Sequence, residues 1–155
     1  MKLSGLTIRQ LAIDAAPRYG TEGIPAGRPA TWHYPLVILH TDEGIDGYTM
    51  GYGNQGDGRA ISCLIRDVFW PKIRGENPLE IERLWLRLRR TNRDLYALSD
   101  AMSGMIDVAL WDILGKLRNA PICDLLGPSA TASRAIAPAG PFTRRRSAPT
   151  RRRVR

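Results

Sequence analysis

The chain has 155 residues, of which 43% are hydrophobic and 25% charged, as is typical of a soluble globular domain with a real core. No apolar run reaches transmembrane length and no signal-peptide pattern opens the chain, so we expect a cytoplasmic protein. The net charge of +8 lies entirely in 8 arginines after Gly127, because residues 1–127 hold 15 basic and 15 acidic residues. A domain-wide nucleic-acid surface is therefore not indicated, and nucleic acid is not an expected partner.

The first third of the chain predicts three strands. Their apolar and β-branched runs occupy residues 2–17, 32–41 and 45–52. In the first strand the expected core residues are Leu6, Ile8, Leu11 and Ile13. Because sequential strands with short connections usually pair as neighbours, these segments predict an antiparallel meander.

Three features refine these strands. Pro35 cannot donate a hydrogen bond to a neighbouring strand, so we expect it near the start of its strand or on a sheet edge. The sequence Asp-Glu-Gly that ends at Gly44 predicts a turn, in which the glycine can adopt a positive φ. Gly47 and Gly51 allow a bulge or the close approach of another backbone.

Two glycine-rich segments, residues 18–30 and 53–58, predict loops on either side of the second and third strands. Glycine loops before helices can cradle phosphates, which raises that alternative for residues 53–58. The segment lacks the Gly-Lys-Ser/Thr ending and the βαβ context of nucleotide-binding loops. Nucleotide binding is therefore disfavoured.

The rest of residues 59–127 predicts helices. The first spans residues 59–70, with Pro71 ending or bending it, and the second spans residues 79–90 with Asn77 as its cap. Arginines on the second helix, near three glutamates, indicate a solvated or ion-paired face rather than a binding patch. These arginines are Arg83, Arg87, Arg89 and Arg90.

A longer helix begins near Leu95, with apolar residues recurring at intervals of three and four. This stripe comprises Leu98, Met102, Met105 or Ile106, Ala109, Ile113 and Leu117. Asn119 can adopt the left-handed conformation that ends a helix, and Pro121 prevents continuation. Gly104 and Gly115 suggest that another backbone packs closely against this helix.

The end of this helix carries a family resemblance. Residues 106–116 read Ile-Asp-Val-Ala-Leu-Trp-Asp-Ile-Leu-Gly-Lys, and Pro121-Ile122 and Leu125-Leu126-Gly127 follow at fixed spacing. This pattern resembles the signature that closes the N-terminal domain of the mandelate racemase and muconate lactonizing enzyme branch of the enolase superfamily. The His-Thr-Asp-Glu-Gly turn at residues 40–44 is similar to that family's second hairpin. Met105 departs from the small residue usual in the family.

The resemblance covers residues 1–127 and implies an α+β capping domain: a three-stranded antiparallel meander followed by a helical bundle. In full-length members a bound magnesium ion stabilises an enolate formed by removing a proton next to a carboxylate. The metal ligands and the base belong to a C-terminal barrel, which we find no trace of after Gly127. We therefore expect a truncated lyase- or isomerase-type enzyme with no catalytic residue, metal ligand or cofactor in this chain, and no activity alone.

What a capping domain supplies is a lid. In the resembling enzymes the two loops fold over the barrel mouth, exclude water and select the substrate. The corresponding candidate contacts here are Tyr19, Thr21, Glu22, Trp32, Tyr52 and Asn54. Their polar and aromatic character suits a small carboxylate such as a sugar acid, and an ordinary surface or hinge role is the alternative for each.

The residues offer little independent chemistry. His33 and His40 are seven apart, so an ideal strand places them on opposite faces. Asp107 and Asp112 lie about 140° apart around a helix, which disfavours a paired-carboxylate site. Ser99 and Ser103 lack a plausible histidine partner for a nucleophilic triad.

Residues 128–155 have a different composition, dominated by alanine, proline, serine, threonine and arginine, and we expect them to be disordered. An out-of-frame sequence is one interpretation. The alternative is a non-enzymatic binding module whose basic tail contacts nucleic acid or an anionic membrane. A separately encoded barrel subunit is a third hypothesis, and a capping domain without a barrel should expose an apolar patch and self-associate.

Overall fold

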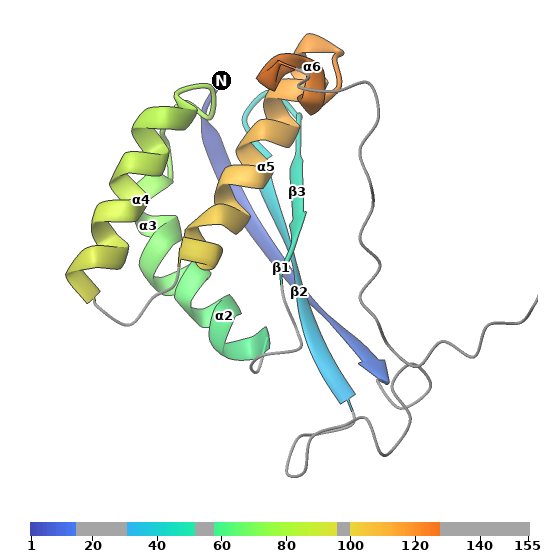
Figure 1. Ribbon diagram of the computed structural model, residues 1–155, viewed down its shortest axis with the longest axis vertical. Helices are drawn as coiled ribbons and strands as arrows, with labels where there is room; N and C mark the ends of the chain where they lie inside the picture. Colours follow the sequence, from blue (N-terminus) through green and yellow to red (C-terminus); the bar gives the residue numbers. More distant parts are fainter. Residues whose placement is uncertain (15–30, 52–57, 96–99, 128–155) are drawn as a thin grey trace, which may run out of the picture.

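The computed structural model describes residues 1–14, 31–51, 58–95 and 100–127. A three-stranded antiparallel sheet of order β1-β2-β3 comes first, and helices follow it and gather on one face of the sheet (Figure 1), which confirms the predicted α+β class. The elements are β1 (Leu3–Asp14), β2 (Thr31–Thr41), β3 (Gly47–Met50), α2 (Gly58–Leu64), the π-helical turn η1 (Ile65–Phe69), α3 (Trp70–Ile73), α4 (Ile81–Leu95), α5 (Asp100–Arg118) and α6 (Ile122–Leu126). The predicted tail, residues 128–155, lies outside the described residues.

The register decides which apolar residues of β1 enter the core. Leu6 and Ile8 pair with the buried Leu39 and Val37, so they face the helices as predicted. Leu11 and Ile13 are 39% and 47% exposed, so their predicted place in the core is wrong. Side chains alternate along a strand, and these two odd-numbered residues lie on the opposite face.

Leu3 is buried on the helix side although it too is odd-numbered. A register shift between Leu3 and Gly5 inserts an extra residue in β1, and this bulge brings Leu3 to the inner face. Leu3 therefore belongs to the core, whereas the sequence pattern had predicted Leu11 and Ile13, further along the strand, as core residues.

Pro35 lies in the middle of the central strand, where it pairs with Gln10 of β1, so its predicted place near a strand start or on a sheet edge is wrong. β3 ends at Met50, opposite Leu36. On that side the Pro35 carbonyl accepts a hydrogen bond from the amide of Gly51 at 2.8 Å. Proline lacks only the donor, so its acceptor can still bond the chain that follows β3.

The first helical stretch continues through Pro71 to Ile73. The turn before it is π-helical, and this wider turn leaves room for a proline ring that would clash in a regular α-helix. Phe69 and Ile73 are fully buried and follow the buried Ile65 at intervals of four residues, so the three share one face. The periodicity alone had assigned neither residue to the core.

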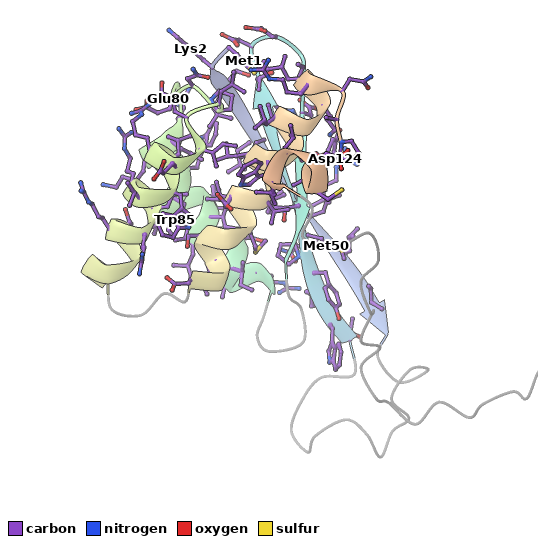
Figure 2. All side chains as sticks on the ribbon, turned by 45° about the horizontal axis from the view of Figure 1, so that its top comes forward. Met1, Lys2, Met50, Glu80, Trp85 and Asp124 are labelled. Carbon is purple, nitrogen blue, oxygen red and sulfur yellow. The ribbon has the colours of Figure 1, made fainter. Side chains whose placement is uncertain are left out.

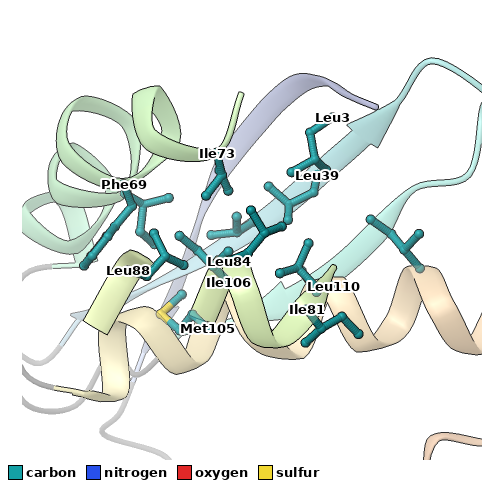
Figure 3. Packing of buried hydrophobic residues seen from close by; sticks show 14 residues of the cluster. Leu3, Leu39, Phe69, Ile73, Ile81, Leu84, Leu88, Met105, Ile106 and Leu110 are labelled. Carbon is teal, nitrogen blue, oxygen red and sulfur yellow. The ribbon is translucent and has the colours of Figure 1, made fainter. Parts of the chain in front are cut away.

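The last two long helices follow their predictions more closely. Asn119 leaves α5 with a φ of 48°, as predicted. Asn77 Oδ1 accepts a hydrogen bond from the Leu79 amide at 3.1 Å, but α4 begins at Ile81, so Asn77 caps the turn before the helix and its predicted place as the helix cap is wrong. Leu117 is 37% exposed, so its predicted place in the buried stripe of this helix is wrong. Figure 3 shows the buried side chains that α4 and α5 contribute beneath the sheet, which include Ile81, Leu84, Leu88, Met105, Ile106 and Leu110.

β3 and α5 touch backbone to backbone at Gly47. A Cβ on Gly47 would lie 2.1 Å from the Ala109 carbonyl oxygen and 2.7 Å from Ile113 Cγ1, so the predicted close approach is confirmed. Nothing lies within 4 Å of a Cβ on Gly104, so the same prediction is wrong there. At Gly115 the nearest atom, 3.1 Å away, is the Ala120 carbonyl oxygen in the turn that ends the helix.

Candidate functional site

The predicted lid residues are only partly within the described structure. Trp32 lies half-buried in β2, opposite Ile13 of β1. The other five lie outside the described residues: Tyr19, Thr21, Glu22, Tyr52 and Asn54. Their assignment to a substrate site therefore stays a prediction.

The structure does show where the two segments predicted to form a lid are attached. Residues 15–30 connect Asp14 to Thr31, which pair at the end of the β1–β2 ladder. Residues 52–57 connect Gly51 to Gly58, and a Cβ on Gly58 would lie 2.2 Å from the carbonyl oxygen of His33. Both segments are thus attached at the same end of the sheet (Figure 1).

A side chain that the sequence pattern did not single out joins these two attachment points. Gln10 Nε2 donates to the Gly58 carbonyl at 3.0 Å and to the Ser62 hydroxyl. The Ser62 hydroxyl donates to the same carbonyl at 2.8 Å. Gln10 therefore ties the start of α2 to β1. Only the strand register reveals this role, since an isolated glutamine in a strand carries no signal of its own.

The two histidines lie on opposite faces of the sheet, as predicted. His33 pairs with Ala12, on the same face as Gln10, whereas His40 contacts Thr7 and Asp46 on the other face. His40 Nε2 lies 2.8 Å from Thr7 Oγ1 and its Nδ1 lies 2.9 Å from Asp46 Oδ1. This chain of contacts fastens the residues before β3 to both β1 and β2, which is a structural role.

The second acid and the lysine of the α5 pattern also have structural roles. Asp112 Oδ2 accepts hydrogen bonds from the Tyr48 amide at 2.8 Å and from Lys116 Nζ at 2.7 Å. Lys116 Nζ also donates to the Asp46 carbonyl at 2.6 Å and lies 4.2 Å from the centre of the Tyr48 ring. Together they fasten α5 to the free edge of β3.

Asp107 has a different environment on the same helix. Burial raises the pKa of its carboxyl above the ordinary aspartate value, and a hydrogen bond from the Trp111 indole offsets part of that rise. Asp112 accepts a hydrogen bond from the Tyr48 amide at the β3 edge, so the two aspartates make separate contacts. This agrees with the predicted angle of about 140° between them around the helix axis.

The arginines of α4 are partly ion-paired, as predicted. Glu76 accepts from Arg83 at 2.6 Å and from Arg87 at 2.5 Å, and Arg83 also pairs with Glu80. Hydrogen bonds from Arg83 and then Arg87 hold the pKa of Glu76 below its ordinary value. Arg89 lies over the Trp85 ring, 5.0 Å from its centre.

The described residues do not form a metal centre. Within residues 1–14, 31–51, 58–95 and 100–127, no three His, Cys, Asp or Glu side chains gather closely enough to hold a metal ion. The side chains present therefore do not fit the magnesium ion that the family resemblance implies, and we derive no chemical step through it. The same part of the chain contains no helix with the length and apolarity needed to cross a bilayer.

Comparison with known sequences gives a consistent set of relatives. Residues 25–127 match the family model described as mandelate racemase / muconate lactonizing enzyme, N-terminal domain. The chain is 32% identical over 119 residues to an arabinonate dehydratase of Saccharolobus solfataricus, covering 73% of this chain and 32% of the relative. It is 35% identical over 106 residues to a D-galactonate dehydratase of Klebsiella pneumoniae, covering 63% of this chain and 26% of the relative.

Solved structures place the same fold in longer proteins. The 3,6-anhydro-D-galactonate cycloisomerase of Zobellia galactanivorans aligns with a TM-score of 0.64 at 30% identity, over 82% of this chain and 32% of that protein. The chain thus spans about a third or less of the length of the relatives it matches.

Proposed function

Because the chain belongs to the mandelate racemase / muconate lactonizing enzyme N-terminal domain family, we propose that it is the capping module of an enzyme acting on acid sugars. The dehydratases and the cycloisomerase named above support this substrate class. In this proposal the module covers the mouth of a barrel, excludes water and selects the substrate, while the barrel supplies the magnesium ligands and the base.

The observation that carries the proposal is the shared attachment of the two lid segments. Gln10 and Gly58 join the β1–β2 end to the start of α2, so residues 15–30 and 52–57 leave the same end of the sheet. Two segments held at one end can close over one substrate, and a rigid base reduces the entropy lost on closure. Trp32 lies at this end and is the described candidate for a substrate contact.

The partner in this proposal is a barrel, either in the same polypeptide or in a separate subunit. An apolar surface on the sheet face away from the helices supports this, and we call it the outer sheet face. Its most exposed large side chains are Leu11, Ile13, Tyr48 and Met50. Met50 is 57% exposed, and such a surface gains free energy when a second domain covers it.

A domain exchange tests the proposal. Residues 1–127 would replace the N-terminal domain of the Klebsiella D-galactonate dehydratase, and dehydration of galactonate and arabinonate would be assayed. We expect turnover by the hybrid and none by the bare barrel or by this chain alone. A folded hybrid with no more activity than the bare barrel would contradict the capping role.

A matched pair of variants separates the lid from the scaffold. Gln10→Ala in the hybrid should raise KM several-fold, because it loosens the shared base of the two segments. Thr91→Ala, which removes a hydroxyl bonded to the Arg87 carbonyl on α4, should leave KM unchanged. Equal effects of both substitutions would indicate that only general stability was altered.

A further inference from the structure

A shallow hollow of about 660 Å³ lies between α3 and α4, away from the strands that carry the lid segments. It is lined by Pro71, Lys72, Arg83, Leu86, Arg87, Arg90 and Thr91. Four of these seven residues are cationic and none is acidic. Arg83, Arg87 and Arg90 follow one another at helical intervals of four and three, so α4 presents them along one side.

Two of the guanidinium groups are held in place from outside the hollow. Arg87 Nη1 donates to the Lys72 carbonyl at 2.9 Å and to Glu76 Oε1 at 2.5 Å, which also joins α4 to α3. Arg83 Nη2 donates to the other oxygen of Glu76 at 2.6 Å. A fixed guanidinium loses less conformational entropy when it binds an anion than a freely rotating one does. This fixing distinguishes the hollow from an ordinary solvated basic face.

The local charges do not cancel. Glu76 and Glu80 compensate two of the four cations, which leaves an excess of two positive charges around the hollow. Within the part of the chain that the structure describes, no recorded ion pair involves Lys72 or Arg90. A dianion would neutralise this excess, whereas a monocarboxylate would neutralise half of it.

The size and the lining of the hollow exceed what an inorganic ion needs. Its volume lies within the range of roughly 300–1,000 Å³ that is usual for small-molecule sites. Pro71 and Leu86 add apolar surface, and Leu86 is 43% exposed. These two side chains can contact the organic body of a ligand while the cations contact its charged group.

We propose that this hollow binds a small phosphate ester, with Lys72, Arg87 and Arg90 contacting the phosphoryl oxygens. Arginine forms forked hydrogen bonds to phosphate, and lysine adds a compact charge. The site is independent of the capping role, because none of its lining residues belongs to β1, β2 or the lid segments. It would let a phosphorylated metabolite regulate or stabilise the module.

Titration of the full chain with glucose 6-phosphate, followed by amide NMR shifts and calorimetry, tests the proposal. We expect shifts centred on Lys72, Arg87 and Arg90, and at least tenfold weaker binding for the Lys72→Ala/Arg90→Ala double variant. Arg89→Ala is the matched control, because it removes the same charge from the same helix while its guanidinium stacks on Trp85. This control should bind within twofold of the parent.

Three outcomes would overturn the proposal. Equal weakening by Arg89→Ala, or shifts confined to the arginines of residues 128–155, would indicate unspecific attraction to positive charge. Galactonate binding at this hollow as tightly as glucose 6-phosphate would contradict the preference for a dianion. Undiminished binding by a double variant with a parental circular dichroism spectrum would exclude the hollow itself.

Discussion

The contact between β3 and α5 differs sharply from the β1–β2 ribbon at the lid-bearing end. At the contact, Gly47 meets the α5 backbone, and Ala109 and Ile113 are fully buried. In the ribbon, Leu11 and Ile13 remain 39% and 47% exposed although both are large and apolar. Figure 2 shows side chains crowded between the helices and the sheet. The β1–β2 ribbon extends beyond the labelled Met50, away from the helices.

This difference separates what the domain needs to fold from what it offers to a partner. The helices bury one face of the sheet near β3, so packing in that region contributes directly to the stability of the fold. The exposed apolar ribbon adds little to folding, because a two-stranded ribbon is only marginally stable in water. Its surface suits contact with a barrel, which fits the proposed capping role.

Removing core volume next to the contact should have the largest effect. Leu110 is fully buried, and Leu110→Ala should lower the free energy of unfolding by about 3 kcal/mol. Ile13→Ala in the ribbon is the control and should change it by less than about 0.5 kcal/mol. Urea unfolding followed by circular dichroism measures both. Similar losses at the two positions would contradict the distinction between the regions.

Adding one methyl group at the contact should have the next largest effect. Gly47→Ala would place a Cβ 2.1 Å from a backbone oxygen, so β3 and α5 must separate, at a cost of about 2 kcal/mol. Gly104→Ala meets nothing within 4 Å and should stabilise the protein by about 0.5–1 kcal/mol through helix propensity. Thermal unfolding of both variants checks the opposite signs.

Removing the acid that closes the β3 edge should have a smaller effect. Asp112→Ala leaves the Tyr48 amide and Lys116 without their carboxylate, and the partly exposed site should cost about 1 kcal/mol. Asp124→Ala, at an exposed position on α6, should change stability by less than about 0.5 kcal/mol. Amide hydrogen exchange at Tyr48 should quicken only in the first variant.

Two acids should give opposite pH effects. The folded-state pKa of Asp107 lies above its unfolded value, so its ionised form costs stability at neutral pH, and the cost disappears as pH falls through that pKa. Glu76 has a lowered folded-state pKa, so it stabilises above its unfolded pKa and loses this contribution on acidification. At pH 7 Asp107→Asn should therefore be more stable than the parent and Glu76→Gln less stable. Unfolding curves measured on acidification from pH 7 should show the Asp107→Asn difference shrinking first, while the Glu76→Gln difference should shrink only below the unfolded pKa of that glutamate.

Polar substitution in the ribbon should have the smallest effect on stability and a measurable effect on association. The Leu11→Ser/Ile13→Ser variant should change the free energy of unfolding by less than about 0.5 kcal/mol, since both side chains are already exposed. If the outer sheet face drives self-association, sedimentation velocity should show less concentration-dependent association in the variant. Arg9→Ser on the same strand is the control. Unchanged association in the double variant would exclude the ribbon from that contact.

Local patterns predicted the parts of the fold that depend on nearby residues. The left-handed exit at Asn119 is confirmed, because it depends on the chemistry of one side chain and its immediate backbone. The buried positions Ala109 and Ile113 follow from helical periodicity. The family signature around them identifies the domain, although the carboxylate and the lysine within it have structural roles here.

The errors arose where a distant part of the chain decides the outcome. Leu11 has the same character as Leu6, and only its pairing with β2 places it on the exposed face. Pro71 was expected to end or bend the first helix, and the helical stretch continues through it to Ile73 after a π-helical turn. For the candidate site, the lid role of residues 18–30 and 53–58 stays a prediction, and Trp32 is the one proposed contact that the structure describes.

The sequence by itself determined the order of strands and helices, the exit from α5 at Asn119 and the family, because each depends on periodicity, backbone conformation or a motif read within a few residues. The tertiary structure alone decided that Gln10 joins the two lid attachments, that Gly47 admits α5, and that Lys72 meets the arginines of α4. These contacts join residues far apart in the chain, and their geometry depends on register and packing that no local pattern encodes.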